Sequence, residues 1–412
     1  MGPSAGTGGE AAAARWRGLR EHPDAPPWSH DIGDRLVAGD LAAVEVFRAS
    51  LGRVARGFED TPLERWRATV PWLEREEPTS SRADLATRVH LFVPTDADLD
   101  RMIRYDTAGT SGVALPIPSH PVATACSWVL IEEALRRWGI ALDRGPDLVV
   151  AHVNAQRRTW TFASSISQWG GAGFVKVNLQ AGAWSPARAR AFFADVKPQL
   201  VTGDPVSFAE MLGWDLPVRP RALISTATTL SPAFAAELAA RCGCPVIDWY
   251  STTETGPVAA TSPRGLELLC PDLFVEIVDA EGRALPEGER GEVCVTGGRN
   301  PSLALVRYRT GDSAALRDGV LEGFVGRRPV WWRAGDGCPV TPVDLAHVLH
   351  TTPVAAFSFG PAGGGFELRV RPTARTDVER LREGFAAMLK AEVRVVIDEA
   401  LGGDGKAEEW RG

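Results

Sequence analysis

Short apolar segments alternate with helical segments through the middle of this 412-residue chain, and this alternation constrains the fold more than any other feature. The segments between the apolar runs have apolar residues at helical spacing, and residues 121–140 read as one longer helix. Strand–helix alternation predicts an α/β fold with a mostly parallel sheet, which binds ligands at the carboxyl ends of its strands. The predicted strands are 147–153, 174–179, 199–203, 222–226 and 245–250.

The pattern differs on either side of this region. Residues 11–99 have apolar side chains at mixed three- and four-residue spacings, which is typical of helices. Residues 273–297 alternate apolar and polar side chains around Gly- and Pro-containing turns, which predicts antiparallel strands. We therefore expect a large domain over 1–326, with 1–15 disordered, and a small, mobile α+β lid domain over 327–412, built around a helix at 376–391.

Charge and hydropathy exclude several classes of protein. The net charge is −7 and the pI is near 5.6, so a broad basic surface for nucleic acid is not expected. No run of about 18 apolar residues predicts a membrane span, and the first residues lack the basic-then-apolar order of a secretory signal. The six cysteines are scattered, so we expect reduced thiols and a cytoplasmic location.

The stretch "DWYSTTETGPVAA", residues 248–260, places hydroxyl groups around one carboxylate directly after an apolar segment. Ser and Thr side chains at this position can cap free backbone N–H groups in a turn. Hydroxyl groups and a carboxylate at a strand end also suit a polyphosphate and a metal ion. The stretch by itself leaves both interpretations open.

Four further motifs carry polar groups on Gly-containing segments. "TAGTSG" (107–112) can expose successive N–H groups and hydroxyls to phosphate oxygens. "YRTGD" (308–312) places a carboxylate on an expected strand-end turn, where it can accept ribose hydroxyls. "GRR" (326–328) precedes the expected lid. "GGDGKAEEW" (402–410) contains Lys406, which is one of only four lysines with Lys176, Lys197 and Lys390.

The order of these motifs resembles that of the adenylate-forming ligase superfamily, and the wording "LVRYRTGD" is most similar to the phenylacetate–CoA ligase group. The resemblance covers about residues 100–410. It implies ATP-dependent activation of a carboxylic acid as an acyl-adenylate, followed by transfer to CoA. ATP, Mg²⁺ and CoA are the implied cofactors, an aromatic acid is the implied substrate, and a homodimer is a candidate assembly.

The resemblance also implies roles for individual residues. Thr107, Thr110 and Ser111 would hold the β- and γ-phosphates of ATP. Thr253 would contact the α-phosphate, and Glu254 would ligate Mg²⁺, a hard cation that prefers oxygen ligands. Lys406 would stabilise the negative charge that develops between the carboxylate and the α-phosphate. The expected nucleoside contacts are Asp312 and Arg327 for the ribose and Ser225, Thr226 and Tyr250 for the adenine.

The pocket for the acid is expected around the strands that precede the Tyr250–Glu254 segment. Aromatic and small residues there would suit a flat aryl acid, although each aromatic residue could equally belong to the core. The candidates are His152 as a polar contact, together with Trp160, Phe162, Trp169, Gly170 and Trp249.

The sequence departs from the family pattern at four places. Ser251 replaces the usual glycine of the 250–254 segment, and "STATTL" (225–230) lacks the glutamate often found near adenine. The other two departures bear on the reaction. Gly112-Val113-Ala114 follow the phosphate loop where relatives usually have a lysine, and Arg328-Pro329 follow Arg327 where an acidic hinge residue is usual. Proline fixes φ near −65°, so the lid rotation used for CoA transfer would be altered. Two alternatives therefore stay open: a synthetase that transfers the acyl group to an amine, a hydroxyl or a carrier-protein thiol, and a degenerate nucleotide-binding protein without activity.

Overall fold

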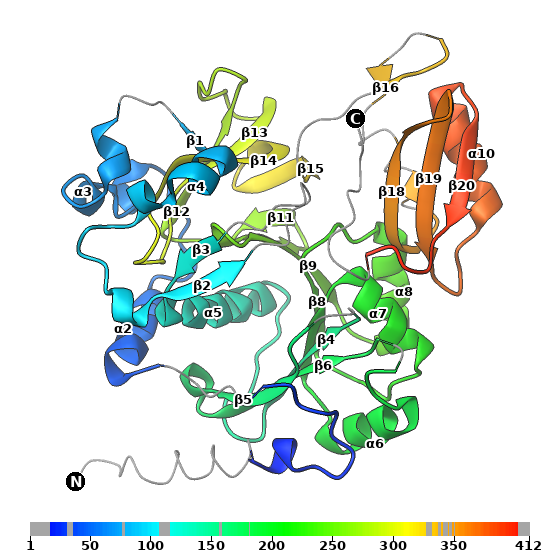
Figure 1. The fold of residues 1–412 in the computed structure, drawn as a ribbon, viewed down its shortest axis with the longest axis horizontal. Coiled ribbons are helices and arrows are strands. Elements are labelled where there is room, and N and C mark those ends of the chain that lie inside the picture. The colour runs from blue at the N-terminus through cyan, green and yellow to red at the C-terminus, as the bar shows by residue number, and fades with distance from the viewer. Residues whose placement is uncertain are drawn as a thin grey trace. The chain divides into compact units, whose positions relative to one another are not determined.

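The fold is described from a computed structural model of the chain (Figure 1). Backbone contacts divide the chain into two compact units. The first unit comprises Met1–Asp34, Leu142–Asp248 and Val330–Gly412, and the second comprises Arg35–Ala141 and Trp249–Pro329. The expected domain boundary between 326 and 327 falls just before the third segment of the first unit. The described residues are 17–30, 36–75, 79–106, 116–155, 159–180, 182–326, 332–336, 339–340, 345, 348–349 and 351–402.

The first unit contains the strand–helix alternation, and its sheet confirms the expected mostly parallel α/β fold. The strand order is β5-β6-β4-β7-β8-β9, and every neighbouring pair is parallel except β5 and β6. The strands are β4 (Val149–Asn154), β5 (Phe162–Ile166), β6 (Ala172–Asn178), β7 (Leu200–Gly203), β8 (Ala222–Ser225) and β9 (Val246–Thr252). A 3₁₀ turn, η5 (Ser167–Trp169), joins β5 to β6.

Three helices connect the parallel strands and cover one face of this sheet, as Figure 1 shows in green. They are α6 (Pro186–Val196), α7 (Pro205–Gly213) and α8 (Pro232–Cys242). Each begins with proline, which is pre-organised for the first helical position and has no N–H to leave unpaired. The residue before the proline also caps two of them: Asp204 accepts from the N–H of Ser207 at 2.8 Å, and Ser231 accepts from Phe234 at 3.2 Å.

The two faces of this sheet differ in chemistry because successive strand residues point to opposite sides. On β4, Val149, Ala151 and Val153 belong to the apolar core that the sheet forms with the three helices. Burial of one large apolar side chain in such a core stabilises the fold by about 1.5–3 kcal/mol. The alternate residues His152 and Asn154 lie on the opposite face. Other large members of the core are Val175, Val177, Phe192, Phe193, Phe208 and Phe234.

The C-terminal segment of the first unit forms a small α+β structure. Its sheet has the order β18-β19-β20, with β19 and β20 parallel, and α10 lies against it (Figure 1). Arg371 on β19 pairs with Glu210 on α7, which ties this sheet to the helices. The elements are β16 (Trp332–Arg333), β17 (Pro339–Val340), β18 (Val354–Ala362), β19 (Gly365–Pro372), α10 (Val378–Leu389) and β20 (Val393–Ile397).

The second unit contains the antiparallel strands that the sequence predicts after residue 273, and several that it does not predict. Its sheet has the order β12-β13-β14-β15-β11-β10-β9. The strands are β10 (Gly256–Ser262), β11 (Gly265–Leu268), β12 (Leu273–Val278), β13 (Arg290–Gly297), β14 (Leu305–Arg317) and β15 (Val320–Val325). Strand β1 (Ser80–Ser81) pairs with β14, and β2 (Ile103–Asp106) forms a hairpin with β3 (Pro116–Ser119).

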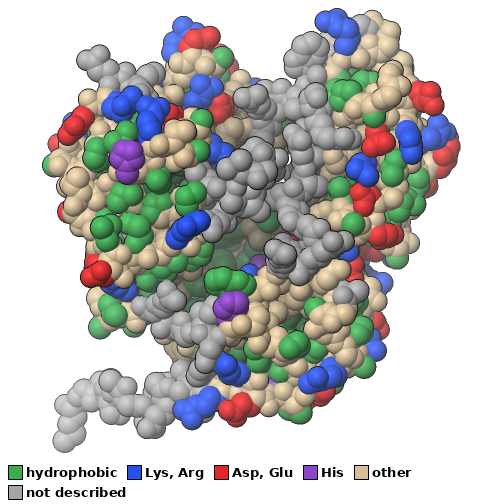
Figure 2. Space-filling model, viewed as in Figure 1, with side chains coloured by type: hydrophobic (Ala, Val, Ile, Leu, Met, Phe, Trp, Pro, Cys, Tyr) green, Lys and Arg blue, Asp and Glu red, His purple; other side chains and the backbone are tan. Residues whose placement is uncertain are grey.

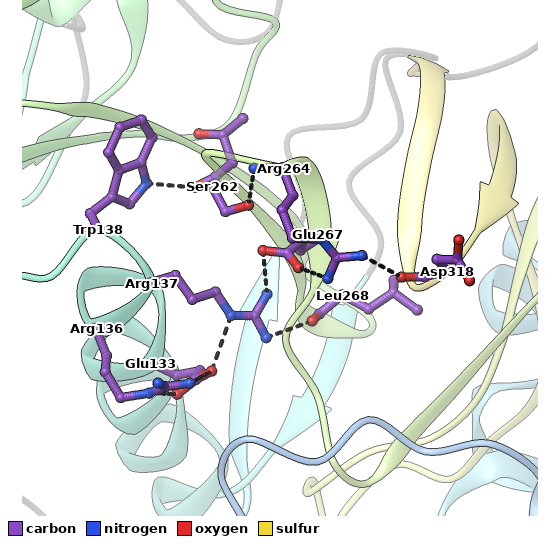
Figure 3. Close-up of polar contacts among 10 residues, drawn as sticks. Glu133, Arg136, Arg137, Trp138, Ser262, Arg264, Glu267, Leu268 and Asp318 are labelled. Carbon is purple, nitrogen blue, oxygen red and sulfur yellow. Dashed lines mark hydrogen bonds and ion pairs between the residues drawn. The ribbon is translucent and has the colours of Figure 1, made fainter.

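The long helix expected at 121–140 is α5 (Pro121–Arg137), and a network of charges joins its last turn to β11 (Figure 3). Glu133 is only 1 % exposed, and it accepts from Arg136 and Arg137. Arg137 also donates to the carbonyl of Leu268 at 2.9 Å. Burial opposes ionisation of Glu133, but the two guanidinium groups outweigh it and lower the pKa of this carboxyl.

The expectation of a helical N-terminal region is correct only in part. Helix α2 (Ala38–Ala49) packs on α5 through Val44, but α3 (Leu63–Trp66) and α4 (Arg82–Arg88) are short. Glycine and proline interrupt the helical spacing, so 3₁₀ turns take the place of longer helices. These turns are η1 (Phe58–Asp60), η2 (Pro71–Glu74), η3 (Val89–Phe92) and η4 (Leu99–Arg101).

Two surface features agree with the composition. Within the described residues, no helix combines the length and the apolar character that crossing a membrane requires. On the face that Figure 2 shows, the described Lys and Arg side chains are interspersed with Asp and Glu, without a broad patch of one sign.

Candidate functional site

The hydroxyl-rich segment 250–254 is divided between a strand and a turn. Strand β9 continues to Thr252, and the chain then turns before β10 begins at Gly256, which has φ +66°. Thr252 Oγ1 accepts from the N–H of Thr255 at 3.0 Å, so one hydroxyl does cap the turn. Thr253 and Glu254 occupy the turn itself and line a cavity.

Tyr250 and Asp312, both predicted nucleoside contacts, meet in the second unit. The Tyr250 hydroxyl donates to Asp312 Oδ2 at 2.7 Å, and its ring centroid lies 4.3 Å from that of Phe324. Tyr250 and Asp312 are both buried. Burial, and then the neighbouring Asp312 carboxylate, raise the pKa of Tyr250 well above its ordinary value, so the phenol stays a hydrogen-bond donor.

The position of Asp312 corrects one expectation, because "YRTGD" does not end a strand. Strand β14 runs without a break from Leu305 to Arg317, and Gly311 adopts φ +80° within it. The register between β13 and β14 shifts next to this glycine, which is the signature of a β-bulge. Glu292 stabilises the bulge by accepting from Gly311 N at 2.9 Å and from Arg309.

Glu254, the predicted magnesium ligand, is paired with an arginine from a distant segment. Arg82 Nη1, at the start of α4, lies 2.5 Å from Glu254 Oε1, and 172 residues separate the two in sequence. Glu254 is 8 % exposed. The pKa of Tyr308 on β14 is raised by burial first and by the Glu254 and Asp312 carboxylates in addition, so all three side chains lie close together. We call Arg82, Tyr250, Glu254, Tyr308 and Asp312 the Glu254 site.

The donor set of the Glu254 site suits Mg²⁺ only together with a phosphate ligand. Among the described residues, no three His, Cys, Asp or Glu side chains are grouped closely enough to hold a metal ion. Magnesium, however, is commonly bound by one or two carboxylates, with water and substrate phosphates completing its octahedron. Glu254 beside the Thr253 hydroxyl fits that mode, and Arg82 neutralises the carboxylate without the ion.

A cavity of about 240 Å³ opens beside the Thr253–Glu254 turn, within the second unit. Tyr105 on β2 and Thr124 on α5 line it, with their hydroxyl oxygens 3.1 Å apart. Arg299 lines it as well and pairs with Asp272 at 3.0 Å. The remaining lining residues are Ser119, Ala123, Ser127, Glu254, Thr255, Gly256, Pro257, Gly297, Gly298, Asn300, Leu303 and Leu305. Tyr250 and Asp312 do not line this cavity.

The predicted adenine-flanking residues lie in the first unit, at the end of β8. Ser225 is fully buried, and Thr226 is half-buried directly after the strand. The Thr226 N–H donates to the carbonyl of Gly203 at 2.9 Å, which keeps the ends of β7 and β8 together. Trp249, a predicted pocket residue, begins the Trp249–Pro329 segment of the second unit and is 8 % exposed.

The structure separates the other predicted pocket residues into two groups. His152 and Phe162 are both register neighbours of Lys176, near the carboxyl end of β6. Trp169 and Gly170 precede the amino end of β6, and Trp169 is fully buried. Because β5 runs antiparallel to β6, residues that are close in sequence lie at opposite ends of these strands.

Trp160 lies on the surface of the first unit. It is 59 % exposed, and its ring stacks on His30 with centroids 4.2 Å apart. Five predicted site residues lie outside the described residues. They are Thr107, Thr110, Ser111, Arg327 and Lys406.

Sequence reasoning missed three side chains that the structure places beside predicted ones. Arg82 and Tyr308 belong to the Glu254 site, and Lys176 lies beside His152. No local pattern marks Arg82, because its contact with Glu254 depends on the tertiary fold. Lys176 did carry a signal, since a charged residue interrupts the apolar strand "FVKVNL".

Comparison with known proteins gives one family match, to the AMP-binding enzymes, over residues 168–302. An acetyl-coenzyme A synthetase from Wolinella succinogenes is 32 % identical over 103 residues. That similarity spans 23 % of this chain and only 15 % of the relative, well under two thirds of its length.

Solved structures share the fold at low sequence identity. A 2-hydroxyisobutyryl-CoA ligase in a postadenylation state has a TM-score of 0.60 at 16 % identity, covering 90 % of this chain and 88 % of the ligase. An anthranilate CoA ligase in complex with anthranoyl-AMP has a TM-score of 0.54 at 14 % identity, covering 76 % of this chain and 67 % of the ligase. The chain is thus similar to the AMP-binding enzymes over residues 168–302, and it shares its fold with these two CoA ligases.

Proposed function

We propose that this protein is an AMP-forming carboxylate–CoA ligase. It activates a carboxylic acid with ATP to give an acyl-adenylate and pyrophosphate, and it then transfers the acyl group to CoA. The observation that carries this proposal is the Glu254 site, in which the two motifs that the resemblance singles out, 250–254 and 308–312, come together. Relatives named acetyl-CoA synthetase and anthranilate CoA ligase support the same reaction class.

The residues of the Glu254 site suit the binding of a nucleotide. The Asp312 carboxylate accepts one hydroxyl, from Tyr250, and can accept ribose hydroxyls in the same way. Thr253 supplies a hydroxyl donor for a phosphate oxygen. Mg²⁺ bound at Glu254 would neutralise phosphate charge and so ease the approach of an anionic acid.

Lys406 is proposed as the cation that stabilises the charge developing between the acid and the α-phosphate. A carboxylate that approaches a polyphosphate is repelled, so a positive group placed at the reacting atoms lowers the barrier. Thr107, Thr110 and Ser111 are proposed to hold the β- and γ-phosphates, and Arg327 to support the ribose.

The finer details of the reaction are also proposals. An aromatic acid is favoured because Phe162 and Phe174 provide an apolar wall beside His152, with ring centroids 5.7 Å apart. CoA is the favoured acceptor. The sequence Arg328-Pro329 favours the second candidate, a synthetase that uses an amine, a hydroxyl or a carrier-protein thiol, because proline restricts the backbone where the lid would turn.

ATP–pyrophosphate exchange with a panel of aromatic and aliphatic acids tests the first half-reaction. We expect exchange with at least one acid, and a loss of roughly 10²–10³-fold in Glu254→Gln and in Lys406→Ala, the typical loss when one charge-stabilising contact is removed. Glu289→Gln is the matched control, because Glu289 is an exposed carboxylate of the same unit.

Two outcomes would contradict the proposal. Exchange with none of the acids would favour a nucleotide-binding protein without activity. Exchange that survives Glu254→Gln within a few-fold would remove the role of this carboxylate. Adding CoA and looking for a thioester by mass spectrometry then separates the ligase from the synthetase.

A further inference from the structure

A lysine, a histidine and a threonine form a row across three strands of the first unit. Lys176 on β6 is the register partner of His152 on β4, and His152 is the partner of Thr202 on β7. His152 Nδ1 and Thr202 Oγ1 are 2.7 Å apart. We call these three residues the Lys176 row. It lies on the sheet face opposite the helix-covered core, which contains none of the three.

The Lys176 row holds a positive charge that has no acidic partner in the part of the chain that the structure describes. Lys176 is half-buried, and no described residue forms an ion pair or a hydrogen bond with its ammonium group. Burial lowers the pKa of Lys176, since water that would solvate the charge is excluded. An ammonium group in these surroundings is stabilised when an anion binds beside it.

His152 does not compete for that anion as a second cation. Burial, and then the charge of Lys176, lower the pKa of His152 to about 3, so the imidazole is neutral at physiological pH. Because His152 Nδ1 is hydrogen-bonded to Thr202, the Nε2 atom of the ring can form a second hydrogen bond.

A second unsatisfied group lies two residues further along the same face. Asn154 is the register partner of Asn178, and both follow the Lys176 row toward the carboxyl ends of β4 and β6. Asn154 is 5 % exposed, and its Nδ2 has no hydrogen-bond partner among the described residues. A buried amide donor without an acceptor is costly, and an anionic oxygen would satisfy it. Ligands of parallel sheets bind at this end of the strands.

The row is bounded on one side by aromatic carbon. Phe162 on β5 is the other register partner of Lys176, and Phe174 lies on the same face of β6. Their ring centroids are 5.7 Å apart. A ligand at the row therefore meets one cation, neutral donors and an apolar wall.

We propose that Lys176 binds a second anionic group of the acid substrate, with His152 and Asn154 as neutral donors beside it. The substrate class is then the dicarboxylic acids, whose hydrocarbon part lies against Phe162 and Phe174. This inference rests on the proposed function, in which Lys406 serves the reacting carboxylate and leaves Lys176 for another group.

Pairs of acids that differ by one charge test the proposal. Benzene-1,4-dicarboxylate, adipate and succinate are each compared with their monoamide in the exchange assay. We expect at least one diacid to exceed its monoamide in kcat/KM by roughly 10-fold or more, the value of one hydrogen bond to a charged group. Lys176→Met should abolish that preference through KM of the diacid, and Lys176→Arg should keep part of it. Lys197→Met, at an exposed position of the same unit, should change nothing.

Three results would overturn the assignment. They are a wild-type preference for the monoamides, an unchanged preference in a folded Lys176→Met variant, and a loss of preference in Lys197→Met. If no acid supports exchange, the proposed function fails. Calorimetry then tests separately whether the Lys176 row binds a diacid. Diacid binding is then measured with a non-hydrolysable ATP analogue present. Binding that Lys176→Met weakens by roughly 10-fold or more supports the row, and equal or absent binding in both proteins rejects it.

Discussion

The Glu254 site and the Lys176 row both place charge in a buried part of the molecule, but they neutralise it differently. In the Glu254 site, Glu254 is paired with Arg82, and Asp312 accepts from Tyr250. In the Lys176 row, the ammonium group has no acidic partner among the described residues, and His152 is neutral. In the Glu254 site the protein itself neutralises the buried charge, whereas in the Lys176 row we propose that a ligand neutralises it.

This difference predicts opposite effects of mutation on stability. Removing one member of a satisfied buried pair leaves an uncompensated charge and destabilises the fold. Removing an unsatisfied charge takes away a desolvation cost and stabilises it, which is a common property of residues kept for function.

The largest expected effect is at Arg82. Arg82→Met leaves Glu254 buried without its cation, and we expect it to lower the free energy of unfolding by about 3 kcal/mol. This value is the lower end of the range for breaking a buried ion pair, because the Arg82 side chain is partly exposed. Chemical denaturation measures the loss. Arg67→Met is the control, because the Arg67–Glu64 pair is exposed and should contribute less than about 1 kcal/mol.

The double variant Arg82→Met/Glu254→Gln should recover most of that stability but no exchange activity, because it removes the stranded charge together with the proposed phosphate contact. Equal stability of the Arg82→Met and Arg67→Met variants would show that the Glu254 carboxylate is solvated rather than dependent on Arg82.

A smaller loss is expected at Tyr250. Tyr250→Phe removes the Tyr250 donor from the buried Asp312 carboxylate, which should cost about 2 kcal/mol. Thermal or urea unfolding at neutral pH measures it. Between neutral and alkaline pH, the free energy of unfolding should fall less in this variant than in the parent. The native tyrosine keeps its proton above pH 10 while the unfolded chain loses it, so the parent loses stability as the pH rises.

The Lys176 row should be acid-sensitive. The pKa of His152 is about 3 in the native state, against an ordinary value near 6.5, so the unfolded chain binds more protons below pH 6.5. The contribution of neutral His152 to the free energy of unfolding is fully present above pH 6.5 and decreases toward pH 3. At pH 5.5 it is lower than at neutral pH by about 1.4 kcal/mol. His152→Gln keeps a hydrogen bond to Thr202 but cannot take the proton. A parent and variant with the same pH dependence between 7 and 5 would rule out a neutral buried His152.

The smallest effect has the opposite sign. Lys176→Met should raise the free energy of unfolding by about 1 kcal/mol, because an apolar side chain replaces a half-buried ammonium group. Lys197→Met should leave stability within about 0.5 kcal/mol of the parent. A destabilised Lys176→Met would mean that the lysine has a structural partner, and the contrast between the two regions would disappear.

Much of the fold could be predicted from the sequence because its signals are local. The helix at 121–140 and the strands at 199–203 and 222–226 lie within a few residues of α5, β7 and β8. Apolar periodicity and Pro or Gly at the ends determine such elements. The short strands β5, β10 and β11 were not predicted, because strands of four to seven residues with mixed composition resemble loops.

The candidate site could be predicted only in part for the same reason. Tyr250, Glu254 and Asp312 stand in motifs that can be read directly, and the structure brings them together. The bulge at Gly311 could not be predicted, because the irregular register between β13 and β14 creates it.

The sequence by itself determined the α/β alternation and the motifs around Glu254 and Asp312, since each strand, helix and motif is encoded within a short run of consecutive residues. Only the tertiary structure decided that Arg82 neutralises Glu254 and that no described residue does the same for Lys176. Whether a buried charge is neutralised depends on side chains from distant segments. Arg82 and Glu254 are 172 residues apart in sequence, so no local sequence pattern predicts their contact.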